Sequence, residues 1–223
     1  MQKNHITNPL RIPKRDPIIR EKTEIRTLFE DIMLKLALQF KEETKNAKKE
    51  QEETKYCIGA VIFSWSFLEA YINNFINNKL YRFKTDMDGN DYLQLPTIQK
   101  YRFISKIISG KTFSKEKEPF NSFLLLKRIR NKLVHYEAKM EEIGEYVKPK
   151  KIEKQCQEKF KIKEKKSMDV LRKILTRECA EWVIKTTIDV VKEFEDNVYG
   201  KNNHTFLIKN ILAEELNLKN SKL

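Results

Sequence analysis

The fold is decided by a stretch of 28 residues that runs from Tyr56 to Phe83 and has the sequence YCIGAVIFSWSFLEAYINNFINNKLYRF. Its large apolar side chains recur every three or four residues, which is the spacing of one face of an α-helix. They are Ile58, Val61, Ile62, Trp65, Leu68, Ile72, Phe75, Ile76 and Leu80. The stretch therefore predicts a long helix whose apolar side is buried in a helical core.

Other segments on both sides show the same helical spacing. They cover residues 24–40, 97–108 (ending near Gly110), 119 to about Met140, and 167–198, with a short tail helix at 206–216. We therefore predict an all-α fold, an antiparallel up-and-down bundle of four to five core helices. One domain would span residues 23–200, between an extended basic arm at 1–22 and a C-terminal tail helix within 201–223.

Polar and charged stretches separate these helices. Lys41–Lys55 holds five Lys and five Glu, and is either a solvated helical extension or a helix–helix connection. Asp86–Asp91 is predicted to be a turn. Lys148–Lys166 carries nine Lys and three Glu, which fits a contact with an RNA backbone and a solvated loop equally well.

Composition narrows the class of protein. Only five Gly and six Pro, with 35% charged residues, favour a helix-dominated chain. The formal charge of +13 favours an anionic partner, of which nucleic acid is the commonest, although a generally lysine-rich proteome would also produce it. The longest apolar run, Cys57–Phe67, is too short to span a bilayer, and we expect no signal peptide at the N-terminus, where no apolar run occurs.

Few features of the sequence indicate a metal site or a cofactor-binding site. The three cysteines have no C-x-x-C spacing, and the three histidines are scattered. There is no Gly-rich phosphate loop. We therefore expect a soluble cytoplasmic protein with reduced thiols, no metal, no cofactor and no membrane contact.

One polar group stands inside the apolar segment that begins at Pro119. It consists of Arg130, Asn131 and His135. Buried polar groups cost free energy unless they are paired, so a core helix has no packing reason to carry them together. Cleavage of a phosphodiester needs such a set, because one group must move protons while another holds negative charge.

A helical wheel divides this segment into two faces. Arg128, Asn131 and His135 fall on one stripe, whereas Arg130 lies about 140° from His135. The opposite, core-facing stripe is formed by Leu126, Ile129, Leu133, Tyr136 and Met140. Arg130 must therefore bend around the helix, or reach a cleft from a second copy of the chain.

The sequence Arg130-Asn131-x-x-x-His135, together with the preceding helix around Trp65–Asn73, resembles the HEPN superfamily, whose nuclease members carry Arg-Asn-x-x-x-His. The resemblance covers roughly residues 56–198, and only the six-residue motif is specific. It implies an all-α bundle and a metal-independent endoribonuclease of toxin–antitoxin or anti-phage defence systems. It also implies a homodimer with a composite cleft and an antitoxin or regulatory partner protein.

The resemblance also assigns roles. Arg130, Asn131 and His135 match the catalytic residues: a ribose 2′-OH attacks the phosphodiester, His135 transfers protons, Arg130 stabilises charge and Asn131 orients the phosphate or the imidazole. One toxin subgroup has a modified Tyr two residues after the His. Here Tyr136 follows directly and Glu137 takes that place, so this form of regulation is not supported.

Further residues are predicted to support the site. Arg128 would contact phosphate, and Glu69 and Asn73 would either orient the catalytic residues or join two helices by hydrogen bonds. Tyr136 is a supporting neighbour of His135, and the RNA-binding residues are Lys127, Lys132, Lys150 and Lys151.

Alternative interpretations remain open. His135 could instead be an interfacial or half-buried histidine paired with a carboxylate. The whole protein could be a catalytically inactive HEPN-like module that binds RNA or a protein, or a purely structural helical adaptor.

Overall fold

The computed structural model describes residues 19–80, 89–114, 117–135, 151–164 and 170–201. These residues form eight helices and no strand, so the predicted all-α bundle is confirmed. Five helices are long: α1 Ile19–Asn46, α2 Glu50–Asn78, α4 Thr97–Ser109, α5 Phe120–Val134 and α8 Arg177–Tyr199. Three are short: α3 Gly89–Leu93, α6 Lys151–Gln157 and α7 Val170–Ile174. Among the described residues, the five long helices match the expected number of core helices.

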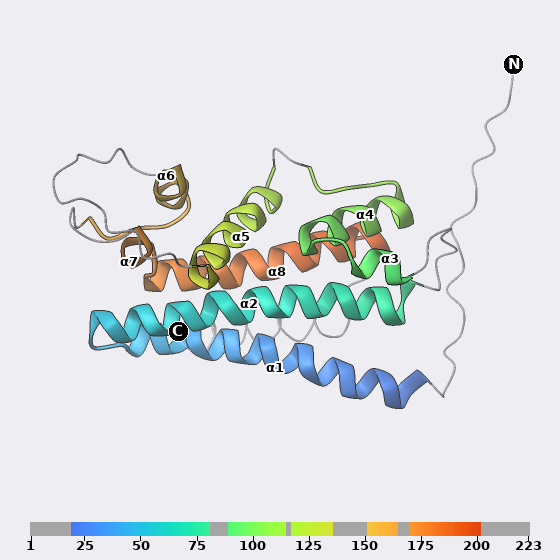
Figure 1. Ribbon diagram of the computed structural model, residues 1–223, viewed down its shortest axis with the longest axis horizontal. Coiled ribbons are helices and arrows are strands. Elements are labelled where there is room, and N and C mark those ends of the chain that lie inside the picture. Colours follow the sequence, from blue (N-terminus) through green and yellow to red (C-terminus); the bar gives the residue numbers. More distant parts are fainter. Residues whose placement is uncertain (1–18, 81–88, 115–116, 136–150, 165–169, 202–223) are drawn as a thin grey trace, which may run out of the picture.

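The helices surround a central pair, α2 and α8. Helices α1 and α2 form an antiparallel hairpin, and α1 covers one side of the pair, while α3 to α7 lie on the other side (Figure 1). Helices α2 and α8 run in the same direction, because Glu53 binds Arg177 near their first turns and Tyr71 binds Glu195 further along. The antiparallel order is therefore interrupted where α3 to α7 carry the chain back to the starting end of α2.

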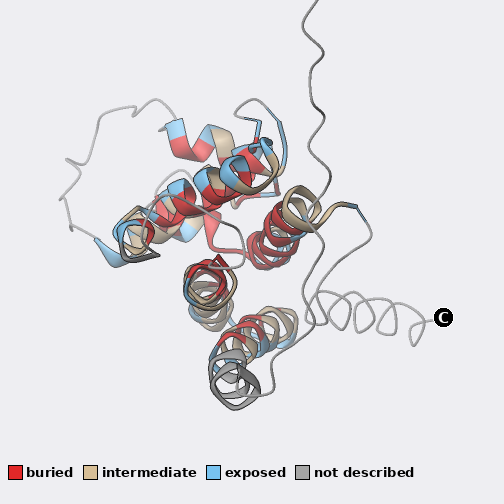
Figure 2. Cartoon of the chain, turned by 90° about the vertical axis from the view of Figure 1, so that its right-hand side faces the viewer, coloured by how far each residue is buried: buried red, intermediate tan, exposed pale blue. Residues whose placement is uncertain are grey.

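The apolar stripe of α2 lies where the sequence places it, against the other helices. Figure 2 shows buried residues on the sides of the helices that face each other. On α2 the side chains of Val61, Leu68 and Ile72 are fully buried. Full burial of one such side chain stabilises the fold by about 1.5–3 kcal/mol, so this stripe is a main source of the stability of the bundle.

A glycine allows α1 and α2 to approach each other closely. The ring of Phe40 lies over Gly59, where an added Cβ would stand 2.6 to 2.8 Å from three ring carbons. The same ring stacks on Phe63, with centroids 5.5 Å apart. No larger residue fits at position 59 without moving Phe40.

The first helices begin earlier than the sequence predicts. Residues 19–22, assigned to the extended arm, form the first turn of α1, and the rest of the arm lies outside the described residues. Helix α2 begins at Glu50 instead of Tyr56, so residues 47–49 alone connect α1 to α2. Acidic residues at 50, 52 and 53 favour this start, because they offset the positive end of the helix dipole.

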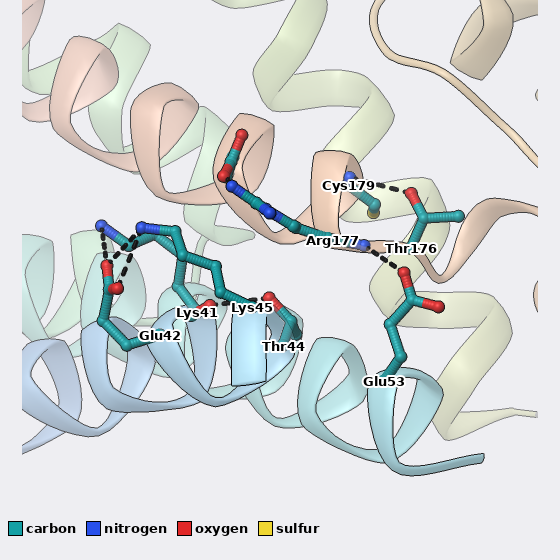
Figure 3. Close-up of polar contacts among 9 residues, drawn as sticks. Lys41, Glu42, Thr44, Lys45, Glu53, Thr176, Arg177 and Cys179 are labelled. Carbon is teal, nitrogen blue, oxygen red and sulfur yellow. Dashed lines mark hydrogen bonds and ion pairs between the residues drawn. The ribbon is translucent and has the colours of Figure 1, made fainter. Parts of the chain in front are cut away.

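The segment predicted as one helix from Ser167 to Val198 is two helices. Helix α7 ends at Ile174, and α8 begins at Arg177. Thr176 has an extended backbone, and its Oγ1 accepts a hydrogen bond from the N–H of Cys179 at 3.2 Å (Figure 3). Glu53 of α2 accepts a second one from the N–H of Arg177 at 2.8 Å. These two acceptors satisfy amides that a helix leaves unpaired at its start.

The lysine-rich stretch and the expected turn both contain short helices. Helix α6 lies within Lys148–Lys166, with Ile152 and Cys156 buried, so this part of the stretch is packed on the core. Helix α3 begins inside the turn expected at residues 86–91. The predicted tail helix at 206–216 lies outside the described residues. None of the described helices has the length and apolar character needed to cross a membrane.

Candidate nucleic-acid interface

Helix α5 carries the motif and has two distinct faces. Leu126 and Ile129 are fully buried, and Leu133 packs against the core with partial exposure. Arg128 on the other face is exposed, and Asn131 is half-buried. The predicted division of this helix is therefore confirmed up to Leu133, while Tyr136 and Met140 lie outside the described residues.

An open groove of about 490 Å³ lies between α5 and α6. It is lined by Arg128, Asn131, Lys132, Lys151, Ile152 and Gln155. Three of these side chains are cationic, and none of the lining residues that the structure describes is a carboxylate. Such a surface attracts polyanions, of which the nucleic-acid backbone is the most common.

A side-chain hydrogen bond joins the two helices across the groove. Nη1 of Arg128 donates to Oε1 of Gln155 over 2.7 Å. The acidic residue of α6, Glu153, is buried and forms an ion pair with Lys173 of α7 at 3.1 Å. Its charge is therefore compensated within the protein, and Glu153 does not line the groove.

Arg130, the predicted catalytic arginine, does not line this groove. Its half-buried side chain donates from Nη1 to Oδ1 of Asn131 over 3.2 Å. Within a single chain, the arginine that lines the groove is Arg128, which the helical wheel places on the same face as Asn131. Arg130 contacts the groove only indirectly, through its hydrogen bond to the lining residue Asn131.

The predicted helix to about Met140 is too long, because α5 ends at Val134. His135 caps the helix with φ −110° and ψ 42°, and its N–H donates to the carbonyl oxygen of Asn131 at 2.9 Å. Its side chain is exposed, and within the described part of the chain its imidazole has no hydrogen-bond or ion-pair partner. His135 is therefore not held by a described carboxylate as a half-buried histidine would be.

Glu69 and Asn73, predicted as supporting residues, have partners on α4. Oε1 of Glu69 accepts from Thr97 at 3.1 Å, and Oδ1 of Asn73 accepts from Nζ of Lys100 at 2.7 Å. Burial lowers the pKa of Lys100, while the charge of Glu69 acts in the opposite direction. These hydrogen bonds hold α4 on α2, which matches the simpler of the two predicted roles.

The predicted RNA-binding lysines have different positions. Lys132 and Lys151 are exposed and line the groove, whereas Lys127 is half-buried and does not. Lys150 lies outside the described residues. No feature of the sequence points to Ile152 or Gln155 as lining residues, because their position beside α5 depends on where α6 docks.

Charge is unevenly divided between the two sides of the bundle. The described residues from α3 to Thr176 contain 16 Lys and Arg against 5 Asp and Glu. The described residues of α1, α2 and α8, with their short connections, contain 14 Lys and Arg against 16 Asp and Glu. The positive charge therefore gathers in the stretch from α3 to Thr176, which forms the side that carries the groove.

The three cysteines form a separate, buried cluster. Cys57, Cys156 and Cys179 are free thiols, and the side chain of Cys179 is hydrogen-bonded with that of Cys57. Burial raises the pKa of Cys156 to about 12, so this thiol is protonated at neutral pH. The described residues contain no group of three or more His, Cys, Asp and Glu side chains placed to hold a metal ion.

Comparison of the chain with protein family models, with curated proteins and with solved structures gives no match.

Proposed function

We propose that the protein is a metal-independent endoribonuclease that binds RNA at the groove between α5 and α6. The observation that carries this proposal is the groove, whose described lining has three cations and no carboxylate. Two of these cations, Arg128 and Lys132, lie on α5 with Asn131, and the exposed His135 directly follows this helix. Cations at the groove would hold the RNA backbone through its phosphates, largely without regard to base sequence.

Three side chains, those of His135, Arg130 and Asn131, would carry out the proposed reaction. The ribose 2′-OH attacks the adjacent phosphorus, and the bond to the 5′-oxygen of the next nucleotide breaks, giving a 2′,3′-cyclic phosphate and a 5′-OH. An imidazole suits both proton transfers, because histidine titrates near neutral pH. Arg130 would stabilise the charge that builds up on the phosphate oxygens, and Asn131 would orient the phosphate.

A second copy of the chain would complete this site. The described part of one chain offers a single histidine, whereas acid–base cleavage uses one group to take a proton and another to give one. A homodimer that joins two α5 ends would supply both imidazoles and would bring Arg130 of one chain toward the groove of the other. The HEPN resemblance adds a toxin or anti-phage role under the control of a partner protein.

A second candidate function is RNA binding without cleavage. It is favoured by two observations, namely that His135 does not line the groove and that Arg130 is engaged by Asn131 within one chain. A protein built in this way would retain RNA through Arg128, Lys132 and Lys151 alone.

Cleavage of bulk RNA in EDTA separates these functions. We expect wild type to cleave, and His135→Ala and Arg130→Ala to lose about 10²–10⁴-fold in rate. Arg172→Ala, which removes an exposed arginine of α7 away from the groove, is the matched control and should retain activity. Undiminished cleavage by His135→Ala would overturn the mechanism, and retention of RNA by an inactive wild type would support the binding module.

A further inference from the structure

Two amides line the groove, and an arginine fixes the orientation of each. Oδ1 of Asn131 faces Arg130, and Oε1 of Gln155 faces Arg128. A guanidinium group has five N–H donors and no acceptor, so the amide atom that faces it must be the oxygen. Each amide is left with its NH₂ group as the part that is free to bind a ligand.

Like these NH₂ groups, the cationic side chains of the groove can bind a ligand. Lys132 and Lys151 have no ion-pair partner among the described residues, and Arg128 is bound only to the neutral amide of Gln155. Apart from the apolar Ile152, every side chain of the groove can therefore donate further hydrogen bonds. The groove is a cationic, donor-rich receptor.

Such a receptor favours the anion that has the highest charge and the most acceptor oxygens. A phosphodiester inside an RNA chain carries one negative charge and two non-bridging oxygens. A terminal phosphate carries about 1.5–2 negative charges at pH 7 and three strong acceptor oxygens, and a di- or triphosphate carries more. Charge-assisted hydrogen bonds are about twice as strong as neutral ones, so the additional charge increases the affinity.

We propose that the groove between α5 and α6 receives a terminal phosphate or polyphosphate, supplied by the 5′ end of an RNA or by a free nucleotide. The inference uses the groove of the proposed function but does not depend on cleavage. The volume of about 490 Å³ suits such a ligand, since sites for small molecules occupy about 300–1,000 Å³.

The test uses one variant that changes the groove and one that does not. Gln155→Glu keeps the length of the side chain and its bond to Arg128, but it replaces an NH₂ donor with a charged acceptor. Gln157→Glu makes the same change of net charge at an exposed position of the same helix, outside the groove. Folding of both is checked by circular dichroism, and Lys151→Ala replaces Gln155→Glu if the latter does not fold.

Binding is measured with inorganic triphosphate, with ATP, and with one RNA oligonucleotide that ends in 5′-triphosphate, 5′-phosphate or 5′-OH. We expect wild type to bind the 5′-triphosphate RNA at least about tenfold more tightly than the 5′-OH RNA, and Gln155→Glu to lose about tenfold or more of that affinity. Gln157→Glu should retain it. ATP binding equal to that of the triphosphate RNA would identify a free nucleotide as a sufficient ligand, and weaker ATP binding would identify the RNA end.

Two results would overturn the inference. One is equal affinity of wild type for the three RNA ends, and the other is an equal loss of affinity in Gln155→Glu and Gln157→Glu. Both leave the proposed cleavage intact, because cleavage is scored separately on the 5′-OH RNA. Conversely, selective binding of the triphosphate end by a protein that cleaves no RNA would support the inference and refute the proposed activity.

Discussion

Glu30 of α1 is a carboxyl group buried near the ends of α2 and α8. It is 4% exposed, and its Oε1 has no hydrogen-bond partner among the described residues. Burial raises the pKa of Glu30 to about 8, although a hydrogen bond from Asn74 and the charge of Lys79 act in the opposite direction. The folded protein therefore holds this carboxyl group in its neutral form at neutral pH.

The pKa shift predicts how stability changes with pH. Below about pH 4.5 Glu30 is protonated in both the folded and the unfolded chain, so it imposes no cost. Between pH 4.5 and about 8 the unfolded chain releases this proton while the folded chain keeps it, so the free energy of unfolding falls as pH rises. The fall is about 1.4 kcal/mol per pH unit, or roughly 3 kcal/mol at pH 7.

Glu30→Gln removes this dependence, because an amide does not ionise. We expect the variant to be more stable than wild type by roughly 3 kcal/mol at pH 7, with no such gain at pH 4.5. Urea denaturation of both proteins at several pH values between 4.5 and 8 measures the difference. Glu43→Gln, a half-buried position on the same helix that remains in contact with water, is the control. A constant difference between Glu30→Gln and wild type at every pH would refute the reasoning.

Two further substitutions test how the helices are joined. Gly59→Ala should destabilise the protein by about 1–3 kcal/mol, because the new methyl group collides with the ring of Phe40. Thermal unfolding measures this change. A variant that is instead stabilised, as is usual when Ala replaces Gly in a helix, would contradict the close approach of α1 and α2. Thr176→Ala should cost about 1 kcal/mol by removing the acceptor for the N–H of Cys179. Hydrogen exchange at the first turn of α8 should then rise relative to the centre of the same helix, and an unchanged rate there would show that Glu53 alone holds this end.

Several features of the fold follow from local rules. Gly110 adopts φ 72° and ends α4 within one residue of the predicted end, because a glycine tolerates this left-handed conformation. The core stripes of α2 and α5 follow from helical spacing alone. By contrast, no local signal ends α5 at Val134, since neither Gly nor Pro follows within the next residues. Threonine is a residue type that favours the N-cap position of a helix, as Thr176 does here. The apolar spacing continues on both sides of Thr176, however, so it predicts one helix where the chain forms α7 and α8.

The spacing of apolar residues along the chain predicts the all-α class, the five long helices and the division of α5 into an apolar and a polar face. These depend on contacts between residues three or four positions apart. The tertiary structure alone decided that α6 docks on α5, so that Gln155 binds Arg128 and closes a cationic groove. This contact joins residues 27 positions apart, and it is fixed by the burial of apolar side chains such as Ile152 and Cys156 and not by the pattern of charges.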